Sequence, residues 1–255
     1  MGNTLHDNVI GEGPNVVLLH GLFGQGTNLG SIARRLQGQF CVHSPDLPDH
    51  GRSGWTAMPS VEGYAEAIAD WMRGRGIAHA HFVGHSLGGK VAMQLALSKP
   101  DLVDKLVVAD IAPVAYPPGH AGVFSGMAAV AAGRCSSRQD AAALLSAHVS
   151  DASVIQFLLL SLKRDNDGAY VWRLNRVGLE AGYPQLSGAL EAATTFDGEA
   201  LFIRGSESSY VTDAAVVDIE RLFNGMVLKT IAGAGHWLHA EKPVAFNALV
   251  LDFLV

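Results

Sequence analysis

The chain has 255 residues, enough to bury a sizeable core, and its 49% hydrophobic and 16% charged residues exclude a disordered chain or a coiled coil. A net charge of −6, with no Lys/Arg cluster to neutralise phosphates, argues against a nucleic-acid partner. The start, MGNTLHDNVIGEG, lacks the features of a signal peptide, and the apolar runs are shorter than the roughly 20 residues of a membrane span. We therefore expect a cytoplasmic protein, a monomer or homodimer, that acts on a small molecule.

The two cysteines, Cys41 and Cys135, lie far apart and form no CxxC or metal-spaced pair. We interpret them as free thiols in a reducing compartment. No motif in the sequence implies a metal or an organic cofactor.

Short runs rich in Val, Leu, Ile and Phe, each closed by Gly, Pro or Asp, predict buried strands. They lie at residues 15–21, 40–48, 80–86, 105–113, 200–206 and 226–236. Helical apolar spacing lies between or after them, near residues 29–36, 68–72, 91–99, 216–223 and 243–253. This alternation predicts an α/β fold with a mainly parallel central sheet flanked by helices.

One region breaks the alternation of strands and helices. Residues 112–195 have helical composition and no clear strand repeat, and a structureless loop of that length is uncommon. We expect a helical cap inserted into a core made of residues 1–111 and 196–255. Two apolar stretches of the cap, VFSGMAAV and VIQFLLLSL, suit a wall for an acyl chain, although a cap helix must also bury one face against the core.

Residues Gly84 to Gly88 form a G-x-S-x-G sequence with a predicted strand before it and an amphipathic helix after it. This context is the one that a nucleophile elbow needs, because a sharp strand-to-helix turn exposes the serine and leaves no room for side chains at the glycines. Ser86 is therefore the candidate nucleophile, at a helix N-terminus that favours developing negative charge.

A serine hydroxyl needs a base of intermediate pKa, and His236 follows the last predicted strand in a glycine-flanked loop. The chain order of serine, acid and histidine is the one expected of this architecture. His239 is the local rival and is expected on a turn surface. His85 abuts the nucleophile, and its side chain is expected to point away from Ser86 and pack the elbow.

The tetrahedral intermediate of acyl transfer needs hydrogen-bond donors for its oxyanion. The run from His20 to Gly24 follows the first predicted strand and lets a backbone N–H approach Ser86. We assign the oxyanion hole to the N–H groups of Leu22 and Leu87. A dinucleotide-binding loop is the alternative reading of GLFGQGTN, but the G-x-G-x-x-G spacing and an acidic ribose ligand are missing.

Three carboxylates are candidates for the acid that orients His236. Asp110 ends the strand that follows the nucleophile strand, so its side chain is expected at the sheet edge of Ser86 and His236. Glu207 lies one residue before Ser208, the position where many such enzymes carry an aspartate. Asp213 precedes a helical pattern and suits an N-cap. We favour Asp110.

Several segments together resemble the α/β-hydrolase superfamily over nearly the full length: HGLFG, DLPDHGRS, GHSLGG and GAGHWLHAEKP. Within it, HGLFGQGTN, VVADIAPVAY, VWRLN and LFIRGSESSYV resemble the YbfF-type esterases and their mitochondrial relatives. The resemblance implies a cap inserted after strand six and an acid on the loop of that strand, which matches Asp110. DLPDHGRS departs from the RNHG-like turn of these esterases near Asp49.

These residues predict two-step acyl transfer, in which Ser86 attacks a carbonyl and His236 moves the proton. The resemblance implies esterase activity on short to medium acyl chains, with acyl-CoA thioesters as a further substrate class. Candidate substrate-binding residues are Phe23, Trp172, Arg173 and Trp237; Arg173 has the charge to contact a coenzyme A phosphate, or to make a cap-to-core contact instead. The alternatives are perhydrolysis, lactone hydrolysis or C–C bond hydrolysis on the same residues, or a ligand-binding protein without activity.

Overall fold

Seven strands form the central sheet of the computed structural model, which describes residues 5–255. They are β1 (Asp7–Ile10), β2 (Asn15–Leu19), β3 (Cys41–Pro45), β4 (Ala80–His85), β5 (Val103–Ala109), β8 (Glu199–Gly205) and β9 (Val227–Ile231). Their order across the sheet is β1-β3-β2-β4-β5-β8-β9. Only β1, the outermost strand on one side, pairs antiparallel with its neighbour, and the other five strand pairs are parallel. The strands of these five pairs therefore direct their carboxyl ends to the same edge of the sheet.

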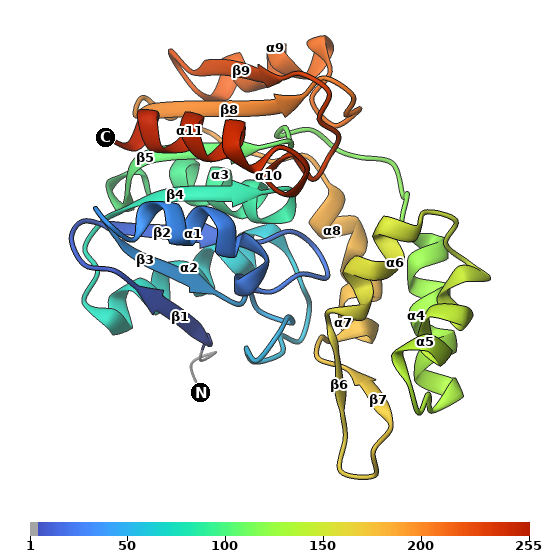
Figure 1. The fold of residues 1–255 in the computed structure, drawn as a ribbon. Coiled ribbons are helices and arrows are strands. Elements are labelled where there is room, and N and C mark those ends of the chain that lie inside the picture. The colour runs from blue at the N-terminus through green and yellow to red at the C-terminus, as the bar shows by residue number, and fades with distance from the viewer. Residues whose placement is uncertain (1–4) are drawn as a thin grey trace.

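Helices cover both faces of the sheet (Figure 1). On one face α1 (Gly30–Leu36) and α11 (Pro243–Leu254) pack their apolar sides on β2, β3 and β8. On the other face lie α2 (Val61–Arg75), α3 (Leu87–Ser98) and α9 (Asp213–Leu222). Short turns complete the core: η1 (Gly26–Leu29), η2 (Pro100–Leu102) and α10 (Leu238–Glu241). Because both faces are covered, the strands are continuous apolar runs, which is the pattern that predicted them.

The six strands and five helices predicted for the core are all present, and the α/β fold with a mainly parallel sheet is confirmed. The short core elements β1, η1, η2 and α10 were not predicted: β1 has four residues of which none is buried, and the other three are single turns. The N-cap assigned to Asp213 was wrong by one residue. Thr212 caps α9 by accepting a hydrogen bond from the Ala215 amide, and Asp213 is the first helical residue.

The cap is inserted along the chain between β5 and β8, and it lies off the carboxyl edge of the sheet (Figure 1). It contains α4 (Ala121–Gly133), α5 (Arg138–Ser146), α6 (Ala152–Leu159), α7 (Arg176–Ala181) and α8 (Tyr183–Ser187). It also contains an unpredicted hairpin of β6 (Leu162–Arg164) and β7 (Tyr170–Trp172), whose strands are too short to give a repeating sequence signal. Counted along this chain, the strand before the cap is the fifth rather than the sixth.

Lys90 fastens both connections of the cap to the helix that follows the nucleophile. Its side chain is buried, and Nζ donates to the carbonyl oxygens of Val114 at 2.9 Å and Ser187 at 3.1 Å, and to that of Gly188. Val114 lies at the entry to the cap and Ser187 at its exit. Burial lowers the pKa of Lys90 to about 8, yet the cation is held by carbonyl dipoles from both sides.

Asp49 is a second cap anchor, and it is wholly buried. Its carboxylate accepts from Thr56 Oγ1 at 2.6 Å, Tyr64 OH at 2.9 Å and Asn175 Nδ2 at 2.8 Å, and its carbonyl accepts from the Asn175 amide at 2.9 Å. Asn175 belongs to the VWRLN segment of the cap. The turn that departs from the related esterases therefore contains an internal core-to-cap junction instead of an open surface.

Replacing Asp49 by alanine is expected to lower the free energy of unfolding by about 3 kcal/mol, because several buried donors lose their acceptor at once. Urea unfolding followed by intrinsic fluorescence measures the change. Asp213→Ala is the matched control, since the Asp213 side chain is 94% exposed and its removal is expected to cost less than about 0.5 kcal/mol. Equal effects of the two substitutions would contradict the role given to Asp49.

Both cysteines are free thiols, with Cys135 buried in the cap. Within residues 5–255, no helix combines the length and the apolar character that crossing a membrane would require.

Candidate active site

Ser86 occupies the sharp turn between β4 and α3. Its backbone has φ 53° and ψ −119°, a region that non-glycine residues rarely occupy, and this conformation exposes the side chain above the sheet edge. The neighbouring glycines are sterically required. A Cβ at Gly84 would lie 2.3 Å from the Gly88 carbonyl oxygen, and a Cβ at Gly88 would lie 2.2 Å from that of Leu19. The elbow predicted from the sequence is therefore present, with glycines at the positions where backbone segments come into contact.

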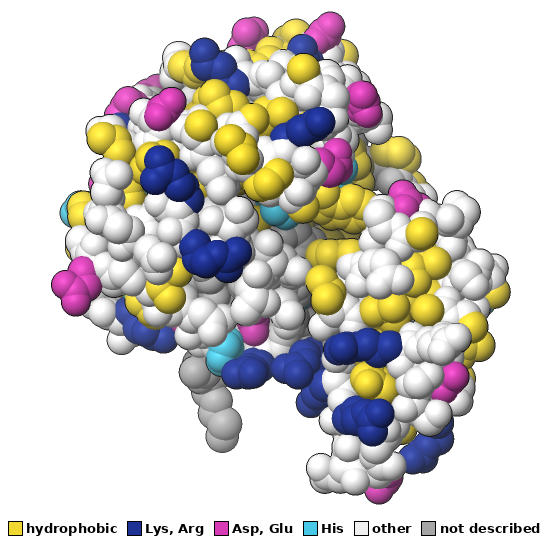
Figure 2. All heavy atoms as spheres, in the orientation of Figure 1, with side chains coloured by type: hydrophobic (Ala, Val, Ile, Leu, Met, Phe, Trp, Pro, Cys, Tyr) yellow, Lys and Arg dark blue, Asp and Glu magenta, His cyan; other side chains and the backbone are white. Residues whose placement is uncertain are grey.

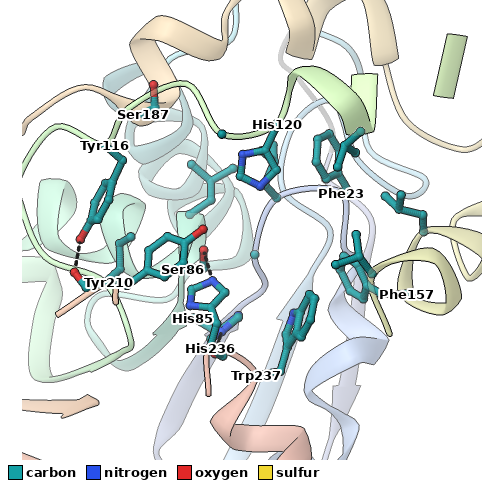
Figure 3. Close-up of a pocket in the computed structure, with 18 of the residues that line it drawn as sticks. Phe23, His85, Ser86, Tyr116, His120, Phe157, Ser187, Tyr210, His236 and Trp237 are labelled. Atoms are coloured by element: carbon teal, nitrogen blue, oxygen red, sulfur yellow. Dashed lines mark hydrogen bonds between the residues drawn. The ribbon is translucent and has the colours of Figure 1, made fainter. Parts of the chain in front are cut away.

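His236 lies within hydrogen-bond distance of both predicted partners. Its Nε2 is 3.0 Å from Ser86 Oγ, and its Nδ1 is 2.7 Å from Asp110 Oδ2. The loop after β9 carries it to the sheet edge, and the His85 ring supports that loop by donating from Nε2 to the His236 carbonyl oxygen at 2.8 Å. The three residues thus form one hydrogen-bonded chain from three separate segments, and Figure 3 shows the bond between Ser86 and His236.

Asp110 is fully buried, with its carboxylate satisfied by three donors. Oδ1 accepts from the Gly205 amide at 3.1 Å, and Oδ2 accepts from both His236 and the Ser208 hydroxyl. The backbone of Asp110 has φ 52°, in the left-handed region that aspartate tolerates better than most residues. These contacts hold the carboxylate as an acceptor for the imidazole N–H.

Neither rival carboxylate reaches His236. Glu207 is exposed and its amide donates to the Ala234 carbonyl oxygen, while Asp213 pairs with Arg204 at 2.8 Å. Ser208 stands where many such enzymes carry the acid, and its role was missed by the sequence argument: its hydroxyl supports the aspartate that arrives from β5.

The loop from His20 to Phe23 passes directly beside the serine. A Cβ at Gly21 would lie 3.3 Å from Ser86 Cβ, a tight contact, so glycine favours this close approach. Leu87 is the first residue of α3, and its N–H therefore has no acceptor within the helix. The two backbone amides predicted as oxyanion donors thus flank Ser86 from two chain segments.

Two buried histidines fix the shape of this loop. His20 donates from Nδ1 to the Gly21 carbonyl oxygen and accepts at Nε2 from the Leu47 amide, and His50 accepts at Nε2 from the Phe23 amide. Each ring is used once as donor and once as acceptor, which requires the neutral form. Burial lowers the pKa of His20 to about 4 and that of His50 to about 3.

His239 is not on a turn surface, contrary to expectation. It lies in α10 with its ring 4.4 Å from that of His85, because α10 folds back over the elbow. Burial, together with the charge of His236, lowers the pKa of His239 to about 4, and burial holds the pKa of His85 well below its usual value.

These four histidines predict a loss of stability in mild acid. Their folded pKa values lie below the unfolded value of about 6.5, so the unfolded chain binds more protons as pH falls from 6.5 towards 4. Stability is complete above that window, and each histidine is expected to cost about 1 kcal/mol near pH 5.5. Urea unfolding at pH 7.5 and 5.5 tests this; an unchanged free energy would contradict the neutral assignments.

A cavity of about 670 Å³ opens above Ser86, between the core and the cap. Figure 2 shows a hollow at this junction with hydrophobic side chains inside it. Apolar residues from both predicted wall segments line it, namely Val123, Val154, Phe157 and Leu158. Phe23 and Trp237 line it as expected, and Trp237 packs against Phe157 with ring centroids 5.8 Å apart.

Trp172 and Arg173 are not among the residues that line this cavity, so its lining gives no support to their assignment to substrate binding. Trp172 is buried inside the cap, where its Nε1 donates to the Met127 carbonyl oxygen at 2.9 Å. The Arg173 amide donates to the Ser161 carbonyl oxygen at 2.9 Å, which ties the hairpin to the end of α6. Of the VWRLN segment, Asn175 makes the contact between cap and core.

Tyr210 is a site residue that the sequence argument missed. Its ring stacks on the imidazole of His236, with centroids 3.8 Å apart and an interplanar angle of 17°. Its amide donates to Ser208 Oγ at 3.2 Å, and its carbonyl accepts from Tyr116 OH at 2.8 Å. An aromatic face on this side of the imidazole stabilises its charged form. The only sequence signal was an aromatic residue just after the LFIRG strand.

A sequence model of the alpha/beta hydrolase family matches residues 16–249. The chain belongs to this family. It is 40% identical over 240 residues to the esterase YbfF of Escherichia coli, covering 94% of this chain and 92% of that protein. It is 36% identical to the mouse sn-1-specific diacylglycerol lipase ABHD11, covering 94% of this chain and 81% of that one.

A solved marine microorganism esterase superimposes with a TM-score of 0.95 at 33% identity, covering 98% of this chain and 99% of that one. The α/β-hydrolase fold and the resemblance to YbfF-type esterases are therefore confirmed. Relatives named esterase and lipase support a hydrolase of the esterase or lipase type.

Proposed function

We propose that the chain is a serine carboxylic-ester hydrolase that works through Ser86, His236 and Asp110. The observation that carries the proposal is the hydrogen-bonded chain of these residues, at 3.0 Å and 2.7 Å, beneath a cavity with an apolar wall. A nucleophile within reach of a base, which is in turn oriented by a third group, is the arrangement that activates a serine hydroxyl.

In the first half-reaction Ser86 Oγ bonds to the ester carbonyl carbon while its proton passes to His236 Nε2. The oxyanion accepts hydrogen bonds from the Leu22 and Leu87 amides, each of which contributes about 3 kcal/mol to transition-state stabilisation. The alcohol leaves with the proton that His236 holds, and an acyl-enzyme forms. Water then attacks the acyl carbon as His236 takes its proton, which releases the acid and restores Ser86.

Asp110 holds the imidazole in the tautomer that accepts at Nε2, and it stabilises the charged ring that forms during both steps. The core, residues 1–111 and 196–255, supplies these groups, and the cap, residues 112–195, selects the substrate. The apolar wall suits a short to medium acyl chain. Thioesters would react by the same steps, but Arg173 does not reach the cavity and so offers no contact for a coenzyme A phosphate.

A substrate panel tests the proposal. The p-nitrophenyl esters of acetate, butanoate, octanoate and palmitate are compared with octanoyl-CoA, a lactone and a diacylglycerol, the substrate named for the mouse relative. We expect the highest kcat/KM for butanoate or octanoate, with Ser86→Ala as the blank. Turnover of the lactone alone would favour a lactonase, and no turnover of any compound would favour a ligand-binding protein.

A further inference from the structure

Two different walls flank Ser86 in the cavity. Figure 3 shows Phe23, Phe157 and Trp237 on one side of the serine, and Tyr210, Tyr116 and Ser187 on the other. The first side is apolar, and the second carries hydroxyl groups. An ester attacked by Ser86 must extend in both directions from its carbonyl carbon, so its two halves meet different chemistry.

His120, from the cap, projects into the cavity across from Ser86 (Figure 3). Its Nδ1 is 2.6 Å from the Tyr183 hydroxyl. A phenol is a stronger hydrogen-bond donor than a neutral imidazole N–H, so the phenolic proton is directed at Nδ1. Burial, together with the charge of His236, lowers the pKa of His120 and keeps the ring neutral. The remaining ring proton therefore belongs on Nε2, which makes this nitrogen a donor.

His120 Nε2 and the Tyr210 hydroxyl both line the cavity and have no protein partner among residues 5–255. Their neighbours are satisfied, since Tyr116 OH donates to the Tyr210 carbonyl oxygen and Ser187 Oγ donates to that of Tyr183. Unused donors in a mostly apolar cavity favour a ligand that supplies an acceptor.

The position of Tyr210 identifies which half of the ester meets these groups. His236 Nε2 must deliver its proton to the oxygen of the leaving alcohol, so that oxygen lies next to the imidazole. Tyr210 is stacked on the same ring. The alcohol half therefore passes the Tyr210 hydroxyl, and the acyl chain turns towards Phe157 and Trp237.

The geometry points to an alcohol-side subsite, formed by His120 Nε2 and the Tyr210 hydroxyl, that selects esters whose leaving alcohol carries a second oxygen close to the scissile bond. This inference rests on the proposed ester hydrolysis. A site built to hydrogen-bond an oxygen discriminates against an analogue that lacks it, because its polar groups are then left unpaired. Esters of diols and polyols are the chemical class that this subsite would take.

The test uses an isosteric pair, 2-hydroxyethyl butanoate and propyl butanoate, which differ only in OH against CH₃. With kcat/KM corrected for the rates of alkaline hydrolysis, we expect the wild-type protein to prefer the hydroxyethyl ester about tenfold, corresponding to two hydrogen bonds. His120→Phe and Tyr210→Phe are each expected to reduce this ratio several-fold, mainly through KM of the hydroxyethyl ester. Tyr170→Phe, which removes a hydroxyl on the β6–β7 hairpin away from the cavity, is expected to keep the wild-type ratio.

An acyl-side pair, methyl 3-hydroxybutanoate and methyl 3-methylbutanoate, distinguishes the two halves of the substrate. We expect no comparable preference there. A ratio near one for the alcohol pair, or a preference confined to the acyl pair, would overturn the inference while leaving ester hydrolysis intact. Absence of turnover above the Ser86→Ala blank for all four esters would instead overturn the proposed function as well.

Discussion

Ser86→Ala is expected to lower kcat for ester hydrolysis by about a million-fold, since the acyl-enzyme no longer forms and only residual catalysis from the surrounding site remains. The turn itself is retained, because its geometry depends on two glycines rather than on the serine hydroxyl. Gly84 leaves room for the carbonyl oxygen of Gly88, and Gly88 leaves room for that of Leu19. We therefore expect a folded protein with little change in Tm. Initial rates on p-nitrophenyl butanoate with high enzyme concentration measure the loss.

Ser146→Ala provides the control for this substitution. Ser146 is exposed on the cap, at the end of α5, and its hydroxyl donates to the Ala143 carbonyl oxygen. Its removal is expected to leave the rate within twofold. A folded Ser86→Ala protein that keeps more than about one per cent of wild-type kcat would mean that another group is the nucleophile.

Asp110→Asn is expected to lower kcat by about 10³- to 10⁴-fold while the fold is retained. The amide is close to the same size, but its NH₂ group cannot accept from His236 Nδ1–H, and the imidazole then turns to the tautomer that cannot take the Ser86 proton. Ser208 and the Gly205 amide still surround the side chain, which limits any change in position.

Glu207→Gln and Asp213→Asn are the matched controls for the acid. Glu207 is exposed, and Asp213 is paired with Arg204, so each is expected to stay within twofold of wild-type kcat. A collapse with Glu207→Gln and near-normal turnover with Asp110→Asn would reverse the assignment.

The elements that the sequence predicted share a strong local signal. The strands β2, β4, β5 and β8 are apolar on both faces, and Gly84 and Gly88 bracket Ser86 in a spacing that few other structures require. Asp110 and His236 follow from the rule that parallel strands end at one edge. These features are encoded within a few residues of each position.

What was missed depends on contacts between distant segments. Trp172 ends a short hairpin and Arg173 follows it, and the packing of this segment within the cap decides that neither residue lines the cavity. Tyr210 and His120 come from a loop and a helix start, and only the folded chain brings them to Ser86. The position of His239 was predicted wrongly because α10, which packs over the elbow, has only four residues. A helix that short gives no periodic pattern in the sequence.

Labelling of the intact protein with a fluorophosphonate, followed by peptide mass spectrometry, tests the catalytic role of Ser86 most directly. The reagent reacts with a serine only where a base activates it and donors stabilise the anion that forms. We predict a single adduct on the peptide that contains Ser86, much slower labelling of Asp110→Asn, and none of Ser86→Ala. An adduct on another serine, or an unlabelled protein that still hydrolyses esters, would contradict the account.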